Sequence, residues 1–158
     1  MNDGTSQKQD PAHVAQQTGA VLRAAVTEQP LEELLAQARE DTATDAMGAV
    51  VTFEGVVRDH DGGALVDALT YTAHPDVDAE MQRVVSEVVA ANPEIRAWVA
   101  HRVGPLKIGE MAFLVVVAAA HRGPAFAAVA ELADRVKSEV PIWKEQAMTG
   151  GDTQWVGL

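Results

Sequence analysis

The sequence predicts a single α+β domain in which helices flank a mostly antiparallel sheet. A chain of 158 residues with 47% hydrophobic and 22% charged content is typical of one water-soluble globular unit. Strand-like and helix-like patterns follow one another in the order β-α-β-β-α-β-β-α-β, without an internal repeat. Strands that follow strands directly favour antiparallel pairing.

The first third of the chain contains a polar tail and three elements. Residues 1–18 are rich in Gln and Asp and lack periodicity, so we expect a disordered tail ahead of a domain over residues 19–158. The run 21–26 predicts a strand. Residues 30–39 predict a short helix, because proline stands at its start, acids in its first turn and leucines on one face. The β-branched run 48–58 predicts a central strand.

The middle of the chain predicts a hairpin, a helix and another strand. Residues 59–63 contain two glycines and predict a turn into a strand over residues 65–72. Apolar residues then recur at helical spacing from residue 77 until Asn92-Pro93 ends the helix. Residues 95–103 predict a strand, and residues 104–109 a turn.

The last third predicts a buried strand, a helix and a closing pair of strands. The apolar run 111–119 suits a buried strand. A helix begins near Pro124, which fits a first helical turn, and ends before Pro141, which forces the preceding residue out of the helical region. Residues 142–148 and 155–156 predict the last two strands.

Composition excludes several classes of function. Without cysteine the chain has no disulfide, thiolate metal site or cysteine nucleophile. A net charge of −11 argues against nucleic acid or a membrane surface as partner. No histidine pair has metal-ligand spacing and no nucleotide-binding loop is present, so we expect neither a metal nor a cofactor. With no transmembrane run and no signal-peptide core, we expect a cytoplasmic protein.

The charge is unevenly placed, which indicates an anionic ligand. Residues 1–45 are acid-heavy, whereas basic side chains concentrate over residues 96–144. His121 and Arg122 precede a predicted helix, where free backbone N–H groups and the helix dipole also favour an anion. For an isolated His-Arg pair, however, the simpler interpretation is a solvated loop that pairs with nearby acids.

Two lysines and one arginine are further candidates. Lys137 lies in the last predicted helical turn, where the dipole favours any cation. Lys144 follows Trp143 on an apolar strand; a partly desolvated lysine is a usable acid or base, although a surface lysine is the simpler interpretation. Arg58 ends a strand before a glycine-rich turn and suits a phosphate or carboxylate, although exposed strand-end arginines are common.

Four ordered sequence blocks resemble the large, catalytic subunit of molybdopterin synthase: GAVVTFEGVVRDH, HRVGPLKIGE, AHRGPAF and VKSEVPIWKE. The similarity extends over about residues 21–156, with family-like spacing between the blocks. Four blocks in order are far more specific than any one of them.

The resemblance implies a sulfurtransferase of molybdenum cofactor biosynthesis with an α/β-hammerhead-like fold. Molybdopterin synthase places two sulfurs on cyclic pyranopterin monophosphate, which forms the dithiolene of molybdopterin. The sulfur arrives as a thiocarboxylate on the C-terminal glycine of a small ubiquitin-like partner, whose Gly-Gly tail enters the large subunit's pocket. A chain without cysteine agrees with this chemistry, since the sulfur need not rest on it. The resemblance also implies a homodimer with one sulfur carrier at each end, a heterotetramer.

The resemblance also assigns roles to individual residues. It implies that Lys137 and Lys144 lie at the reacting centre, with Lys137 as the main catalytic group that holds the thiocarboxylate or belongs to an acid–base relay. Lys144 would position substrate and stabilise developing negative charge. The implied substrate-binding residues are Arg58, His121, Arg122, Val56, Val57, Glu145 and Gln146, with the His-Arg pair supplied by the neighbouring subunit.

Three departures from the family pattern bear on activity. Val56 stands where a lysine is often seen, so one substrate cation is missing. Glu145-Gln146 follows Lys144 where a second basic residue is common, and the chain ends at Leu158 without a longer charged tail. We therefore keep two alternatives beside the active enzyme: a catalytically weak paralogue that acts as a carrier-binding scaffold, and a general phosphate-ligand module.

Overall fold

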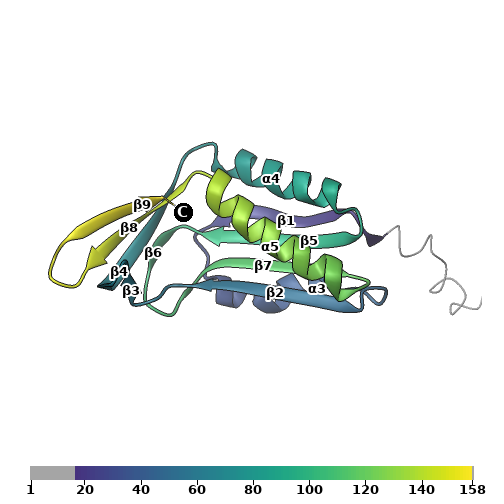
Figure 1. The fold of residues 1–158 in the computed structure, drawn as a ribbon, viewed down its shortest axis with the longest axis horizontal. Helices are drawn as coiled ribbons and strands as arrows, with labels where there is room; N and C mark the ends of the chain where they lie inside the picture. Colours follow the sequence, from purple (N-terminus) through teal and green to yellow (C-terminus); the bar gives the residue numbers. More distant parts are fainter. Residues whose placement is uncertain (1–16, 158) are drawn as a thin grey trace, which may run out of the picture.

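The computed structural model describes residues 17–157 and contains two sheets that meet end to end (Figure 1). The first sheet has the strand order β1-β5-β7-β2. Its strands are β1 (Ala20–Thr27), β5 (Ile95–Arg102), β7 (Met111–Ala119) and β2 (Ala49–Val56). β1 pairs with β5 in parallel, whereas β5 with β7 and β2 with β7 are antiparallel.

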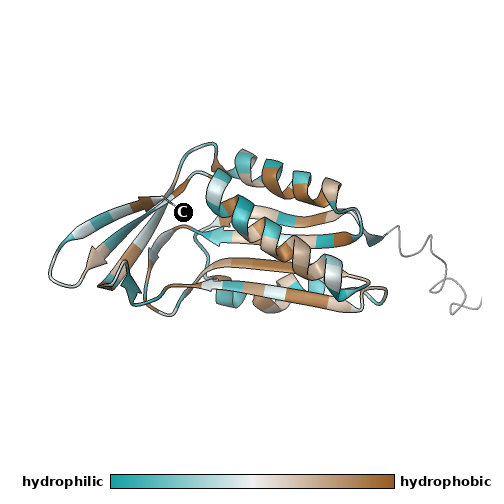
Figure 2. Cartoon of the chain, in the orientation of Figure 1, coloured by the Kyte–Doolittle hydropathy of each residue, from teal (hydrophilic) through white to brown (hydrophobic). Residues whose placement is uncertain are grey.

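Helices cover both faces of the first sheet. Two long helices lie on one face, α4 (Val77–Ala91) and α5 (Arg122–Glu139); a 3₁₀ helix, η1 (Leu31–Glu33), and α3 (Leu35–Thr42) lie on the other (Figure 1). All nine residues of β7 are buried, as expected for a strand with helices on both sides. Figure 2 shows the same strand as a continuous apolar band.

The alternation of side chains along the strands divides the core into two layers. Val115 and Val117 of β7 pack with the face that α4 and α5 cover, whereas Leu114 and Val116 pack toward η1 and α3. Trp98 of β5 belongs to the second layer. The first sheet is therefore the centre of the core, with one apolar layer on each of its faces.

The second sheet is smaller and extends beyond one end of the first (Figure 1). Its central pair is antiparallel: β4 (Ala64–Ala73) with β8 (Ile142–Met148). Three shorter strands complete it, namely β3 (His60–Asp61), β6 (Gly104–Leu106) and β9 (Thr153–Gly157). β3 and β6 pair with β4, and β9 pairs with β8.

A network of ion pairs joins α4 to α5 on their solvent-facing sides. Arg83 of α4 contacts Glu80 and Glu87 on its own helix and Glu139 of α5. Arg135 of α5 contacts Glu139 and reaches back to Glu87. The network fixes the last turns of α5 against α4, and this part of α5 carries Lys137.

The predicted fold class, one α+β domain with a mostly antiparallel sheet and flanking helices, is confirmed, but three local predictions were wrong. The expected turns 59–63 and 104–109 each contain a short strand, β3 and β6, that pairs with β4. Leu106 is buried opposite Leu69, which accounts for the second pairing. The helix expected over residues 30–39 begins as a 3₁₀ turn and continues to Thr42, whose Oγ1 donates to the carbonyl of Ala38 at 2.6 Å.

The predicted disordered tail, residues 1–18, lies outside the described residues except for its last two. Of these, Gln17 offers its carbonyl oxygen to Nη1 of Arg96 at 2.8 Å. The boundary between tail and domain at residue 18 therefore stays a prediction.

Candidate functional site

A cavity of about 360 Å³ lies where the two sheets meet. Its walls come from the end of β2 and the segment after it, from β3, β4, β5, β7, β8 and β9, and from the last turns of α5. Three cations line it: Arg58, Lys137 and Lys144. Three of the five basic residues that the sequence singled out, from two distant parts of the chain, therefore share one cavity.

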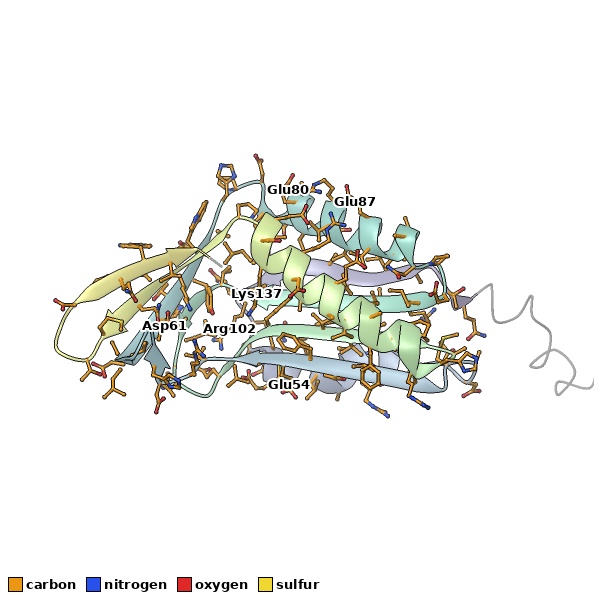
Figure 3. The ribbon with its side chains drawn as sticks, viewed as in Figure 1. Glu54, Asp61, Glu80, Glu87, Arg102 and Lys137 are labelled. Atoms are coloured by element: carbon orange, nitrogen blue, oxygen red, sulfur yellow. The ribbon has the colours of Figure 1, made fainter. Side chains whose placement is uncertain are left out.

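Lys137 reaches the cavity because of the position at which α5 ends. Pro141 follows the helix and Val140 is already extended, so Lys137 stays in the last helical turn, as predicted. In Figure 3, Lys137 extends from α5 toward the junction of the two sheets, the region in which Asp61 and Arg102 are also labelled. Its ammonium therefore lies between the C-terminal end of a helix dipole and the cavity.

Strand alternation decides which residues of β8 face the cavity. Lys144 and Gln146 line it, two residues apart on one face of β8. Glu145 lies on the opposite face, beside a shallow hollow with Ala68 and Thr70. Trp143 is on this outer face too and is 43% exposed, so it does not enclose Lys144. The structure thus separates Glu145 from the other candidates of this strand.

A carboxylate that the sequence analysis did not single out connects the cations. Asp61 of β3 accepts a hydrogen bond from Nε2 of Gln146 at 2.7 Å, and its Oδ2 lies 3.5 Å from Nζ of Lys144. Its other oxygen, Oδ1, lies 3.5 Å from Nη2 of Arg58. The bond from Gln146, with the positive charge of Lys144, lowers the pKa of Asp61 below its ordinary value. Asp61 is therefore ionised at neutral pH and organises one wall of the cavity.

The segment after β2 places three more candidates. Val56 is 53% exposed at the cavity, and Val57 is buried behind it. Backbone hydrogen bonds tie Val57 to Glu110 and Gly109. Arg58 lies two residues beyond the end of β2 rather than in the strand, and its side chain is 67% exposed. Arg58 is thus the cation of the cavity that is most open to solvent.

His121 and Arg122 stand apart from this cavity. His121 is the N-cap of α5 and Arg122 is its first residue, so their predicted place at a helix N-terminus is confirmed. Both are exposed. Arg122 and Lys137 are fifteen positions apart on the helix, about 22 Å at the rise of an α-helix. Within one subunit, neither His121 nor Arg122 lines the cavity that the lysines line.

Two aromatic side chains and a histidine form the inner wall. Tyr71 of β4, Phe113 of β7 and His101 of β5 line the cavity and are buried. From the sequence, His101 is only a histidine of the predicted strand 95–103 that belongs to no metal-binding pattern, so it was not a candidate site residue. Its place in the HRVGPLKIGE block was the available signal.

No group of three or more metal-ligating side chains is placed to hold a metal ion within residues 17–157. In the same part of the chain, no helix is both long and apolar enough to cross a membrane.

Comparison with known proteins places this chain in one family. The family model of the MoaE protein matches residues 26–139. The molybdopterin synthase catalytic subunit of Pyrococcus abyssi is 39% identical over 111 residues, which is 70% of this chain and 75% of that protein. The chain therefore belongs to the MoaE family.

Solved structures agree with this assignment. Molybdopterin synthase from Staphylococcus aureus superimposes with a TM-score of 0.77 at 32% identity, over 84% of this chain and 96% of that one. A chain from the complex of subunits 1 and 2 of the molybdopterin-converting factor of Helicobacter pylori shares the fold, with a TM-score of 0.64 at 19% identity over 87% and 88% of the two chains. The relatives are enzyme components of molybdenum cofactor biosynthesis.

Proposed function

We propose that the protein is the catalytic subunit of molybdopterin synthase, a cytoplasmic sulfurtransferase. It would move sulfur from the C-terminal thiocarboxylate of a small ubiquitin-like carrier to cyclic pyranopterin monophosphate and so form the molybdopterin dithiolene. The observation that carries this proposal is the convergence of Arg58, Lys137 and Lys144 on one cavity in a protein of net charge −11. Concentrated positive charge in an acidic protein favours an anion at that place, and both reactants are anions.

The positions of the three cations support different roles. Lys137, at the end of α5, would attract the thiocarboxylate and is the main catalytic group of the proposal. Lys144 is less exposed and is fixed by Asp61, which suits a cation that stabilises negative charge as it develops. Arg58 is largely exposed, so it would meet the substrate's phosphate at the mouth of the cavity. Val56, Val57 and Gln146 would form the wall beside the pterin.

The carrier would supply the sulfur atom, which this chain has no cysteine to hold. There is no cysteine to hold a sulfur, so the sulfur atom has to enter on another molecule. A slender Gly-Gly tail suits a cavity of about 360 Å³ that must also admit a pterin. The two-subunit complex of the Helicobacter pylori relative supports a small-subunit partner.

A second copy of the chain would complete the site. Because His121 and Arg122 lie about 22 Å from Lys137 along α5, they would reach a cavity only in a neighbouring subunit. We therefore propose a homodimer in which each subunit lends its His-Arg pair to its partner's substrate, with a carrier at each end of a heterotetramer. Glu145, on the outer face of β8, would act in substrate binding only through such a neighbour.

The decisive experiment is a turnover assay with purified protein, thiocarboxylated carrier and cyclic pyranopterin monophosphate. Molybdopterin should form, and Lys137→Ala should lower the rate by at least about a hundredfold. Lys107→Ala is the matched control, since Lys107 is an exposed lysine in the turn after β6, outside the cavity. Near wild-type turnover by Lys137→Ala would remove the role proposed for this lysine.

One observation favours a second candidate function. Val56 presents an exposed apolar side chain to the cavity, at a position where a cation would increase the affinity for a phosphate. A carrier-binding scaffold without catalysis would then form a stable complex with the carrier and yield no product. The same assay separates the two functions, because product formation excludes the scaffold. Equally tight binding of unrelated phosphorylated metabolites would instead favour a general phosphate-ligand module.

A further inference from the structure

His101 combines deep burial with access to the cavity. It is the seventh residue of β5 and only 2% exposed, and it lines the cavity together with Lys137. Neither the charge pattern nor the proposed roles of the lysines accounts for an imidazole at this place. A buried polar ring needs partners for its nitrogens, so the identity of those partners indicates what the ring can do.

One ring nitrogen is committed to the backbone. Nδ1 of His101 lies 2.7 Å from the carbonyl oxygen of Arg102. A carbonyl oxygen can only accept a hydrogen bond, so Nδ1 carries the proton and donates it. In a neutral imidazole the other nitrogen, Nε2, then has a free lone pair and can only accept.

Packing holds the ring in this orientation. The edge of Tyr71 meets the imidazole at 4.8 Å between ring centroids and 77° between planes. Phe113 packs against it at 5.4 Å and 32°. With two aromatic neighbours and a backbone anchor, the ring is fixed, and Nε2 is the nitrogen that remains for the cavity.

The surroundings keep the imidazole neutral. Burial is the main cause that lowers the pKa of His101 to about 4; the positive charge of Lys137 acts in the same direction, and the hydrogen bond to Arg102 acts against it. The other groups that pack on the ring, Tyr71 from β4 and Phe113 from β7, carry no charge, since burial raises the pKa of Tyr71 above its ordinary value. At neutral pH the ring is therefore neither an acid nor a useful base, and acceptance of a hydrogen bond is the chemistry left to it.

We propose that His101 is a substrate-binding residue whose Nε2 accepts a hydrogen bond from a ring N–H group of the pterin. The inference rests on the proposed function, because it takes a reduced pterin, rich in N–H donors, as the substrate. Arg58, Lys137 and Lys144 offer only donors, which suit a phosphate or thiocarboxylate and not an N–H group. The carboxylate of Asp61 is already engaged by Gln146, Lys144 and Arg58. His101 thus supplies a neutral acceptor on the inner wall.

Two isosteric variants separate this role from a purely structural one. In His101→Asn the side-chain amide takes the place of Nδ1 and can still donate to Arg102, but no polar atom occupies the place of Nε2. In His101→Gln the amide reaches the place of Nε2 and can present its oxygen there. Calorimetric titration of each protein with cyclic pyranopterin monophosphate, without carrier, gives the Kd directly. We expect the Asn variant to bind about tenfold more weakly and the Gln variant to stay within about threefold of wild type.

Steady-state kinetics extend the test to turnover. In the Asn variant KM for the pterin should rise while KM for the thiocarboxylated carrier stays unchanged; melting temperatures identify any variant that fails to fold. Wild-type pterin affinity in the Asn variant, or equal loss in both variants, would overturn the proposal, since a purely structural anchor is preserved by Asn. Pterin binding that depends on His101 in a protein without turnover would refute the sulfurtransferase and leave the acceptor role intact.

Discussion

Asp61 and Lys144 meet in the cavity, with 3.5 Å between Oδ2 of the carboxylate and Nζ of the ammonium. An acid at an anion-binding site works against substrate affinity, because it neutralises part of the charge that attracts the substrate. The same contact restricts a long, flexible lysine to one region. Asp61 therefore weakens the attraction for an anionic substrate but restricts the position of Lys144, and a variant can measure both effects.

Replacement of Asp61 by asparagine should separate the two effects. The amide can still accept from Gln146, but the charge that holds Lys144 and Arg58 is gone. We expect kcat to fall roughly tenfold because Lys144 is less well placed, while KM for the pterin does not rise because the cavity gains positive charge. Steady-state kinetics at saturating carrier measure both parameters.

Asp67→Asn is the matched control for this variant. Asp67 is an exposed carboxylate of β4 that accepts from Thr149 outside the cavity. It should leave kcat and KM within about twofold of wild type, as most surface substitutions do. A rise in KM with unchanged kcat for Asp61→Asn would show that Asp61 binds substrate directly instead of positioning Lys144.

The alternation of side chains along β8 gives a second prediction. Gln146 faces the cavity and is 2% exposed, whereas Glu145 faces the other way. Gln146→Leu should lower kcat/KM by roughly tenfold, because the carboxylate of Asp61 loses the hydrogen bond that Gln146 donates to it. Glu145→Leu should leave pterin affinity in the isolated chain unchanged, as titration would reveal. A loss of affinity in Glu145→Leu would mean that β8 presents its other face to the substrate.

The proposed dimer predicts complementation between two inactive proteins. Lys137→Ala removes the catalytic lysine of a subunit's own cavity, and Arg122→Ala removes the arginine lent to the partner. After subunit exchange, half of the dimers are hybrids with one intact site each, so about a quarter of wild-type turnover should return. If both groups act within one subunit, the mixture should remain as inactive as its components.

The buried imidazole of His101 predicts a loss of stability in acid. The unfolded chain takes up a proton near pH 6.5, the folded chain only near pH 4, so the unfolded state binds more protons between these values. The contribution of the neutral imidazole to the free energy of unfolding is therefore complete above pH 6.5 and is lost as pH falls toward 4. At pH 5 this contribution is smaller by about 2 kcal/mol. Urea unfolding of wild type and His101→Gln at pH 7.5 and pH 5 measures the difference. Between pH 7.5 and pH 5, the unfolding free energy of His101→Gln should fall by about 2 kcal/mol less than that of wild type. An equal fall in both proteins would contradict a neutral buried ring.

Long, strongly patterned elements were predictable from sequence. α4 begins at Val77 and ends at Ala91, as the helical spacing and Asn92-Pro93 indicated, and β7 matches the apolar run 111–119. Both depend on local pattern and burial alone. β6 is three residues long and exists because β4, more than thirty residues earlier, offers it an edge, so no local pattern predicts it.

The site was predictable only in part, for the same reason. The helix start predicted near Pro124 was enough to place His121 and Arg122 at the beginning of α5. The cavity, by contrast, depends on pairs such as Asp61 with Gln146, which are 85 positions apart. Lys137 and Lys144 were candidates from their places in the sequence, and the family resemblance implied their roles, but neither carried information about Asp61, whose contacts follow from the fold.

The length of α5 has a consequence for communication between active sites. In the proposed dimer the helix carries Lys137 at one end and the His-Arg pair at the other, so each helix serves two cavities. Ion pairs with α4 and the packing of its buried face hold α5 together as one unit. If substrate binding in one cavity shifts this helix at Lys137, it also shifts the His-Arg pair at the other end. The two halves of the enzyme would then bind their substrates cooperatively, a coupling that would appear as a Hill coefficient different from one.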